Sequence, residues 1–209
     1  MDTFLAAADR SEIWRDFFYT ELTTGLRRGE ICGLMWQDFD EKAGTLKILR
    51  SVNVPKAGEL EIGETKTSQG RRTIRLPPST VQRLKERRKH AVSQWIFPEP
   101  LAPEKPVRPS AAYYWMKRIL REAGLPAIRF HDLRHTFATH ALTSGVDAKT
   151  LSGILGHTRS AFTLDTYTHT TGDMQRRAAE IVGGFLTDYL GEEMAPWQSA
   201  ENAGTAAST

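Results

Sequence analysis

The spacing of apolar residues changes twice along this chain. From Ile13 to Leu22 they recur every three or four positions, which is the period of an amphipathic helix. From Thr45 to Leu76 they alternate in short runs that proline and glycine interrupt, as in β-strands. Beyond Pro77 the helical period returns. This order predicts a mainly helical α+β fold that contains one small antiparallel sheet.

The pattern also predicts where the elements lie. Three short strands are expected over residues 46–52, 60–62 and 74–76 and should form one three-stranded sheet. A proline-rich loop is expected over residues 98–109. Expected helices cover residues 13–22, 31–35, 79–90, 110–124, 131–143, 147–155 and 173–190. Ser110 and Asp147 are the expected N-caps of two of these helices, and Gly156 is expected to turn the chain at a helix end.

The composition is that of an ordinary globular protein. A chain of 209 residues with 40% hydrophobic and 25% charged residues suits one domain, which we place at residues 1–190, followed by a disordered tail at 191–209. No apolar run approaches the roughly 20 residues that span a bilayer, and no signal peptide precedes the domain, so a cytoplasmic location without membrane contact is expected. The single cysteine, Cys32, lies in an apolar helical stretch and is expected to be a packed thiol.

The net charge of +3 is small, but the basic residues are clustered. Nine Lys or Arg residues and only one acidic residue, Glu86, occur in 66–90, and five Lys or Arg residues without an acidic one occur in 105–121. Such clusters can bind nucleic-acid phosphates. For the basic residues of 83–89 alone, an ordinary solvated helix face is an equally good interpretation.

Six residues, taken in chain order, could carry chemistry on a phosphodiester: Arg27, Lys66, His131, Arg134, His157 and Tyr167. Two arginines can hold the non-bridging oxygens of a phosphate in fork geometry, and a tyrosine oxygen can displace an ester bond without a metal. His131 and Arg134 are three positions apart on one expected helix and therefore share a face. The set indicates DNA strand transfer.

Other interpretations of these residue types are weaker. His135 and His140 share a helix with His131, but the glutamate that a zincin needs after its first histidine is missing, so no metal and no cofactor is expected. The remaining four tyrosines are interpreted as packing residues. They are Tyr19, Tyr113, Tyr114 and Tyr189.

Four strings in this chain carry a family resemblance: Thr24-Gly25-Leu26-Arg27-Arg28-Gly29-Glu30, His131-Asp132-Leu133-Arg134-His135-Thr136-Phe137-Ala138-Thr139, Leu155-Gly156-His157 and Thr166-Tyr167-Thr168-His169. In this order they resemble the tyrosine recombinases, especially the integrases of phages and conjugative transposons. The similarity covers nearly all of residues 11–186. It implies a mainly helical catalytic domain with a small sheet, related in mechanism to type IB topoisomerases.

The resemblance also implies roles for individual residues. Tyr167 would attack the DNA and form a 3′-phosphotyrosyl intermediate, without metal or ATP. Arg27 and Arg134 would meet the charge that develops on the phosphate, and His131 and His157 would add hydrogen bonds or accept a proton. Lys66, in a turn between two strands, would protonate the leaving 5′-oxygen. Glu30 would orient its neighbours from behind the site.

Further expectations concern partners. The expected partner is double-stranded DNA, contacted by the basic residues Arg28, Arg71, Arg72, Lys117 and Arg118. The resemblance implies a homotetramer on paired DNA sites for a full-length protein. Because only 26 residues precede Arg27, the family's N-terminal core-binding domain is expected to be absent, which suggests a monomer as an isolated fragment. A topoisomerase-like relaxing enzyme and a non-catalytic DNA-binding accessory protein are the alternative interpretations.

Overall fold

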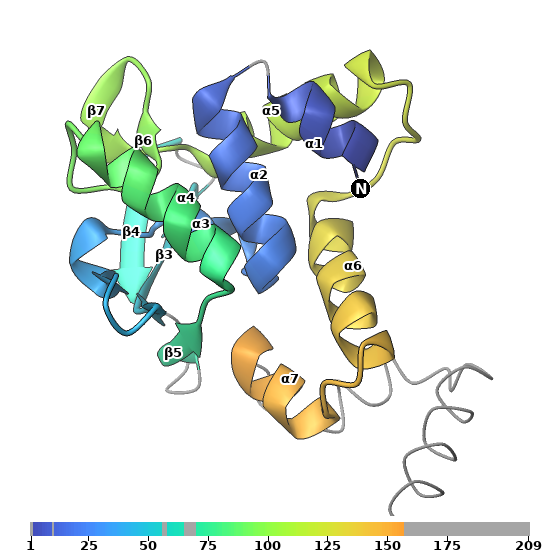
Figure 1. Ribbon diagram of the computed structural model, residues 1–209. Coiled ribbons are helices and arrows are strands. Elements are labelled where there is room, and N and C mark those ends of the chain that lie inside the picture. Colours follow the sequence, from blue (N-terminus) through green and yellow to red (C-terminus); the bar gives the residue numbers. More distant parts are fainter. Residues whose placement is uncertain (1, 10, 56–57, 65–69, 157–209) are drawn as a thin grey trace, which may run out of the picture. The chain divides into compact units, whose positions relative to one another are not determined.

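The computed structural model describes residues 2–9, 11–55, 58–64 and 70–156 (Figure 1). The chain divides into two units, residues 1–168 and 169–209, and every described residue belongs to the first. The predicted boundary of the domain near residue 190 and the predicted helix at 173–190 lie outside the described residues.

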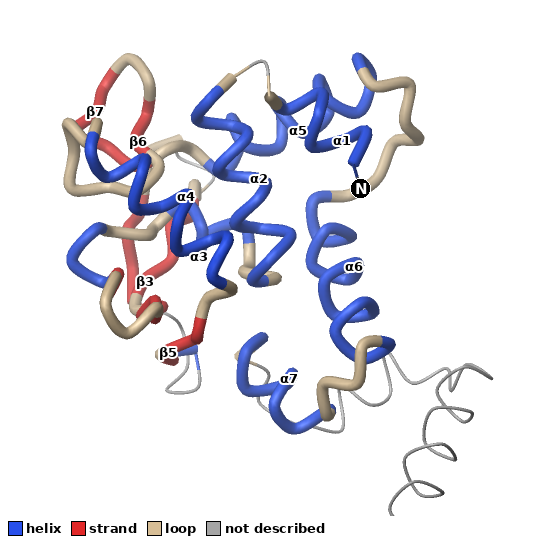
Figure 2. Tube along the Cα trace, in the orientation of Figure 1, coloured by secondary structure: helices blue, strands red, loops and turns tan. Residues whose placement is uncertain are grey.

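The first unit consists of helices with short strands between them. Its α-helices are α1 (Asp2–Ala8), α2 (Glu12–Thr24), α3 (Arg28–Cys32), α4 (Pro78–Lys89), α5 (Pro109–Glu122), α6 (Phe130–Thr143) and α7 (Ala148–Leu155), and one 3-10 helix, η1, covers Trp36–Asp38. Its strands are β1 (Phe39–Asp40), β2 (Thr45–Ile48), β3 (Arg50–Asn53), β4 (Glu61–Glu64), β5 (Arg72–Arg75), β6 (Pro98–Glu99) and β7 (Ala102–Pro106). Figure 2 shows the strands on the side of α2 away from α6.

The three-stranded antiparallel sheet has the order β1-β2-β5. Phe39 pairs with Leu46 and Leu46 with Ile74, and both Leu46 and Ile74 are buried. The α+β class and the size of the sheet are therefore confirmed.

The membership of the sheet differs from the prediction. The expected strand over residues 46–52 divides at Leu49 into β2 and β3. β3 pairs with β4 as a separate hairpin, in which Val52 faces Ile62. Alternation of apolar residues identifies strands but does not select their partners, because several registers bury the same faces.

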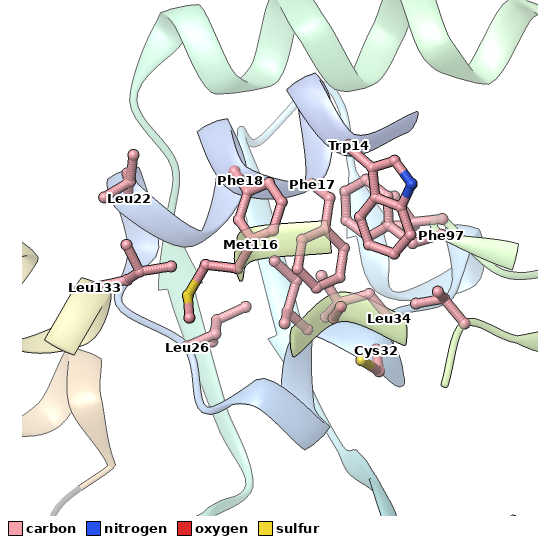
Figure 3. Packing of buried hydrophobic residues seen from close by; sticks show 14 of the residues in the cluster. Trp14, Phe17, Phe18, Leu22, Leu26, Cys32, Leu34, Phe97, Met116 and Leu133 are labelled. Carbon is pink, nitrogen blue, oxygen red and sulfur yellow. The ribbon is translucent and has the colours of Figure 1, made fainter. Parts of the chain in front are cut away.

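The aromatic side chains of α2 form the centre of the hydrophobic core (Figure 3). Phe17 and Phe18 are fully buried and their rings meet edge to face, with centroids 5.2 Å apart. Phe17 also contacts Phe97, which follows the loop after α4. The centroids of these two rings are 5.1 Å apart. Leu133 of α6 belongs to the same cluster, so the core fixes α6 against α2.

Several predicted helix ends are confirmed. Gly25 ends α2 and Gly156 ends α7, both in the left-handed conformation that glycine adopts without strain. Asp147 caps α7, since its Oδ1 accepts a hydrogen bond from the Thr150 amide at 2.9 Å. Cys32 is fully buried as expected, and burial raises the pKa of its thiol.

Other predicted details are wrong. The N-cap of α5 is Arg108 and Pro109 takes the first helical position, where its missing N–H costs nothing, so Ser110 lies inside the helix. The proline-rich segment contains the β6-β7 hairpin, and α1 was not expected. Tyr113 and Tyr114 are exposed on α5 and are not packing residues. None of the described helices combines the length and the apolar character that crossing a membrane requires.

Candidate active site

Arg27 occupies the N-cap of α3, directly after the turn made by Gly25 and Leu26. The carboxylate of Glu30 accepts two hydrogen bonds from Arg27, one from the backbone N–H at 2.9 Å and one from Nη1 at 2.8 Å. Because Glu30 is the third residue of the helix, the short helix fixes both ends of this contact. The Arg27 side chain remains 43% exposed, so its guanidinium is oriented and accessible.

Glu30 is also the partner of Arg72 on β5. Nη1 and Nη2 of Arg72 donate to the two carboxylate oxygens of Glu30 at 3.1 and 2.9 Å, and the Arg72 side chain is only 7% exposed. Burial alone would raise the pKa of Glu30, but hydrogen bonds and charge from Arg72, followed by Arg27, lower it. Glu30 is therefore an anion that joins two arginines from distant parts of the chain.

Three arginines converge on the C-terminal end of α7. Nε of Arg72 donates to the Ile154 carbonyl at 2.6 Å. Nη2 of Arg134 donates to the Leu155 carbonyl and Nη2 of Arg27 to the Gly156 carbonyl, at 2.8 and 3.0 Å. The last carbonyl groups of a helix lack intrahelical partners and carry partial negative charge, so guanidinium groups stabilise them. The three contacts fix the chain immediately before position 157.

Arg134 on α6 lies in the interior and connects two turns. Its Nη1 donates to the Gly25 carbonyl at 2.8 Å, two residues before Arg27, while its Nη2 holds α7. The residue is only 1% exposed. Burial, together with the charge of Arg27, lowers the pKa of Arg134 to about 10, so the guanidinium is charged at neutral pH. The two arginines predicted to act together, 107 positions apart, thus lie around the same two turns.

His131 is exposed on α6 near these groups. Its ring packs edge to face on that of His135, with centroids 4.6 Å apart. Desolvation lowers the pKa of His131, and the charges of His135, Arg134, Arg129 and Arg27 act in the same direction. The neutral imidazole that results at pH 7 can accept a proton or a hydrogen bond.

A pocket of about 330 Å³ lies beside Arg134 and His131. Its lining residues are Glu21, Leu26, Arg28, Tyr113, Arg129, Phe130, His131 and Arg134. Four helices, α2, α3, α5 and α6, contribute to this wall, and most of its charged groups are cationic. The pocket is therefore suited to an anionic group.

Three of the predicted site residues lie outside the described residues: Lys66, His157 and Tyr167. In the sequence, Lys66 falls between β4 and β5, and His157 directly follows the Gly156 carbonyl that Arg27 binds. Their roles stay predictions.

The residues expected to contact DNA have different environments. Arg28 is exposed, with its guanidinium 5.9 Å from the Phe130 ring centre, and Arg71 is exposed with an ion pair to Glu64 at 3.2 Å. The Nζ atom of Lys117 lies 5.7 Å from the centre of the Tyr113 ring. Arg118 pairs with Glu122 at 2.7 Å. These four remain candidates for phosphate contact.

Arg72 is placed differently from that expectation. Its guanidinium is buried against Glu30 and α7, so we assign it to positioning the site rather than to contact with DNA. In the sequence, nothing separates it from its exposed neighbour Arg71 except the alternation of side chains along a strand. The alternation can tell which of the two arginines is buried only when the register of β5 against β2 is known, and the sequence alone does not supply that register.

The amino-acid sequence was also compared with known protein families. The model of the phage integrase family matches residues 1–173. This chain belongs to the phage integrase family.

Relatives of this phage integrase family member include bacterial and archaeal recombinases. The chain is 30% identical to the protein described as tyrosine recombinase XerC-like from Caldanaerobacter subterraneus subsp. tengcongensis, over 79% of this chain and 48% of that protein. It is 31% identical to tyrosine recombinase XerA of Pyrococcus furiosus, over 81% of this chain and 54% of the relative. The chain thus spans about half the length of the curated relatives it matches.

Solved structures share the fold of this phage integrase family member. The Tn1549 transposon integrase, in complex with transposon right end DNA, superimposes with a TM-score of 0.73 at 24% identity, over 87% of this chain and 64% of that one. The crystal structure of XerA recombinase gives a TM-score of 0.67 at 21% identity, over 87% of this chain and 60% of that one. At these identities the likeness establishes the fold.

Proposed function

We propose that this chain is the catalytic part of a site-specific DNA recombinase that cleaves and rejoins strands through a phosphotyrosyl intermediate at Tyr167. The observation that carries the proposal is the convergence of Arg27 and Arg134 on consecutive carbonyl groups, those of Gly156 and Leu155. It concentrates positive charge in front of position 157, ten residues before Tyr167. Membership of the phage integrase family supports this class of reaction.

In the proposed reaction, the tyrosine oxygen attacks phosphorus and displaces the deoxyribose 5′-oxygen. A phenol has an unperturbed pKa of about 10, so its proton must be accepted as the bond forms. His131, neutral at pH 7, is a suitable hydrogen-bonding partner, and His157 is the second candidate. Lys66 would return a proton to the leaving oxygen. Atoms balance without a metal or ATP, because one phosphate ester replaces another.

The arginines stabilise the transition state by charge. The phosphate gains negative charge as the fifth bond forms, and preorganised guanidinium groups meet it without reorganisation. Arg27 presents the exposed guanidinium, held from behind by Glu30. Arg134 contributes a buried positive charge. Its hydrogen bond to the Gly25 carbonyl holds this charge close to the turn that precedes Arg27.

A nicked DNA substrate tests the proposal, because loss of the short strand traps the covalent intermediate. Wild-type chain should form a protein-DNA adduct that resists EDTA. The adduct should be absent in Tyr167→Phe and present in Tyr114→Phe, a matched change at an exposed tyrosine. An adduct that persists in Tyr167→Phe, or one that requires a divalent metal, would contradict the proposal.

The finer assignment to recombination needs a second assay. A recombinase should exchange strands between two matched sites, whereas a topoisomerase-like enzyme would relax supercoiled DNA without pairing sites. A chain that binds DNA and forms no adduct would be an accessory protein. We also propose that the full-length protein acts as a tetramer on paired sites, which sedimentation of the protein-DNA complex would measure.

A further inference from the structure

Glu21, on α2, is a buried carboxyl group to which the proposed reaction assigns no task. It is 0% exposed, and neither of its side-chain oxygens has a hydrogen-bond partner among the described residues. A buried polar group without a partner is costly and rare in a folded protein. Asp16, five residues earlier on the same helix and also buried, is instead bound by Arg15 at 3.2 Å and Arg83 at 3.3 Å. The isolation of Glu21 is therefore specific to its position.

The electrostatic surroundings of Glu21 belong to the active site. Burial raises the pKa of Glu21 well above its usual value; Arg134 on α6 opposes this shift and Glu30 on α3 reinforces it. Burial therefore favours the uncharged form of this carboxyl group. Glu21 also lines the pocket beside Arg134 and His131. The other titratable or charged groups that line this pocket or interact with Glu21 are Arg28, Cys32, Tyr113 and Arg129.

We propose that Glu21 is a positioning residue that acts through Arg134: uncharged, it leaves the guanidinium charge to a bound phosphodiester, and ionised, it withdraws that charge. The proposal rests on the function proposed above. It concerns how strongly the site holds phosphate rather than which residue attacks.

The physical basis is competition for one positive charge in a dry environment. In the interior, where charges are weakly screened, a carboxylate near Arg134 would lower the positive potential that a DNA phosphate meets. Glu30 lowers the positive potential at Arg134 less, because its charge is already neutralised by Arg72 and Arg27. Ionisation of Glu21 would lower the net charge of the group formed by Arg27, Arg72, Arg134 and Glu30 by one unit.

The proposal predicts a pH-dependent difference between Glu21 and an uncharged substitute. DNA binding is measured by fluorescence anisotropy on a labelled duplex at low salt, over roughly pH 6 to pH 10. Tyr167→Phe is present in every sample so that cleavage cannot interfere. The affinity of Glu21→Gln relative to the Glu21 chain should rise on the order of tenfold toward alkaline pH, because glutamine cannot ionise. Glu86→Gln, the same change at an exposed site on α4, should show no such rise.

A second readout uses the protein without DNA. The ¹⁵N resonance of Arg134 Nε should show an additional titration step in the parent chain, at a pH below the titration of the Arg134 guanidinium itself, and this step should be absent from Glu21→Gln. Glu21→Leu should behave like Glu21→Gln in both measurements, and it removes the buried polar group altogether, so it remains informative if the glutamine variant folds poorly.

The outcomes separate this proposal from the proposed function. A flat affinity ratio, or an Arg134 resonance that titrates identically with glutamine at position 21, would overturn the role of Glu21. Absence of a covalent adduct in the nicked-substrate assay would overturn the recombinase function instead. Both readouts for Glu21 can be obtained whether or not the chain cleaves DNA.

Discussion

Glu30 connects the described residues of the candidate site. It receives hydrogen bonds from Arg27 and Arg72, which in turn bind the Gly156 and Ile154 carbonyls. The buried ion pair with Arg72 has its charges compensated on both sides, but removal of one partner would leave an arginine charge without its counter-ion. A change at this one residue should therefore affect the fold and the site together.

Glu30→Gln should lower the free energy of unfolding by about 3 kcal/mol, since Arg72 loses its buried counter-ion. The folded-state pKa of Glu30 is lowered, so the wild-type advantage is complete above about pH 4.5, the ordinary value, and is lost as pH falls through the folded-state pKa. Denaturant unfolding at several pH values measures both effects. Glu64→Gln, which breaks the exposed pair with Arg71, should cost less than about 1 kcal/mol. Equal losses in the two variants would contradict the central role of Glu30.

At the scale of elements, the ends of α2 and α7 meet α6 where the arginines act. Figure 1 shows α7 between β5 and α6, and residue contacts join it to both elements. The turn at Gly25 has a φ of 61°, and a Cβ atom there would lie 2.3 Å from Cδ1 of Phe137 and 3.0 Å from Cδ2 of Leu155. Glycine is required at this position for its backbone conformation and also for the approach of two other helices.

Gly25→Ala should therefore destabilise the protein more than an equivalent change at another helix end. Gly124, after α5, has nearly the same φ, 64°, and open space where a Cβ would lie. Gly124→Ala should cost about 1 kcal/mol for the left-handed backbone alone. Gly25→Ala should cost a further 1–3 kcal/mol, roughly, because α6 and α7 must shift. Thermal unfolding of both variants measures the difference, and equal melting temperatures would show that the turn is not crowded.

Across the described part of the molecule, ion pairs distinguish two kinds of basic surface. On α4, Arg83 and Arg87 pair with Asp16, Lys85 pairs with Glu41 and Lys89 with Glu86. This favours the interpretation of α4 as a solvated helix face rather than a nucleic-acid surface. By contrast, Arg28 is exposed beside the pocket that contains Arg134 and His131. We therefore propose that DNA contacts the pocket side.

Arg28→Ala should weaken DNA binding and reduce the slope of log affinity against log salt by about one, as expected for the loss of one phosphate contact. Lys85→Ala, which removes the same charge from α4, should leave the slope unchanged. Anisotropy titrations of both variants over a range of salt concentrations measure the slopes. A reduction of the slope in Lys85→Ala and none in Arg28→Ala would place the DNA on the other face.

Sequence reasoning reached the local features of this protein because they depend on neighbouring residues. Helix periods, the Gly25 turn, the Asp147 cap and the shared face of His131 and Arg134 all follow from spacing within a few positions. Motif order also identified the family that the comparison confirms. The pairing of the strands, by contrast, was only partly predicted, since alternation is compatible with more than one partner.

Only the tertiary structure decided what the basic and acidic residues do. Arg71 and Arg72 are adjacent in sequence, yet one is exposed and the other is buried against Glu30, 42 positions away. Local spacing does not distinguish Glu21 from other helix residues, but the packing of α2 against α6 buries it near Arg134, with no hydrogen-bond partner among the described residues. The physical reason is that burial and charge act through space, so a side chain's ionisation and accessibility depend on contacts between elements that local spacing does not determine.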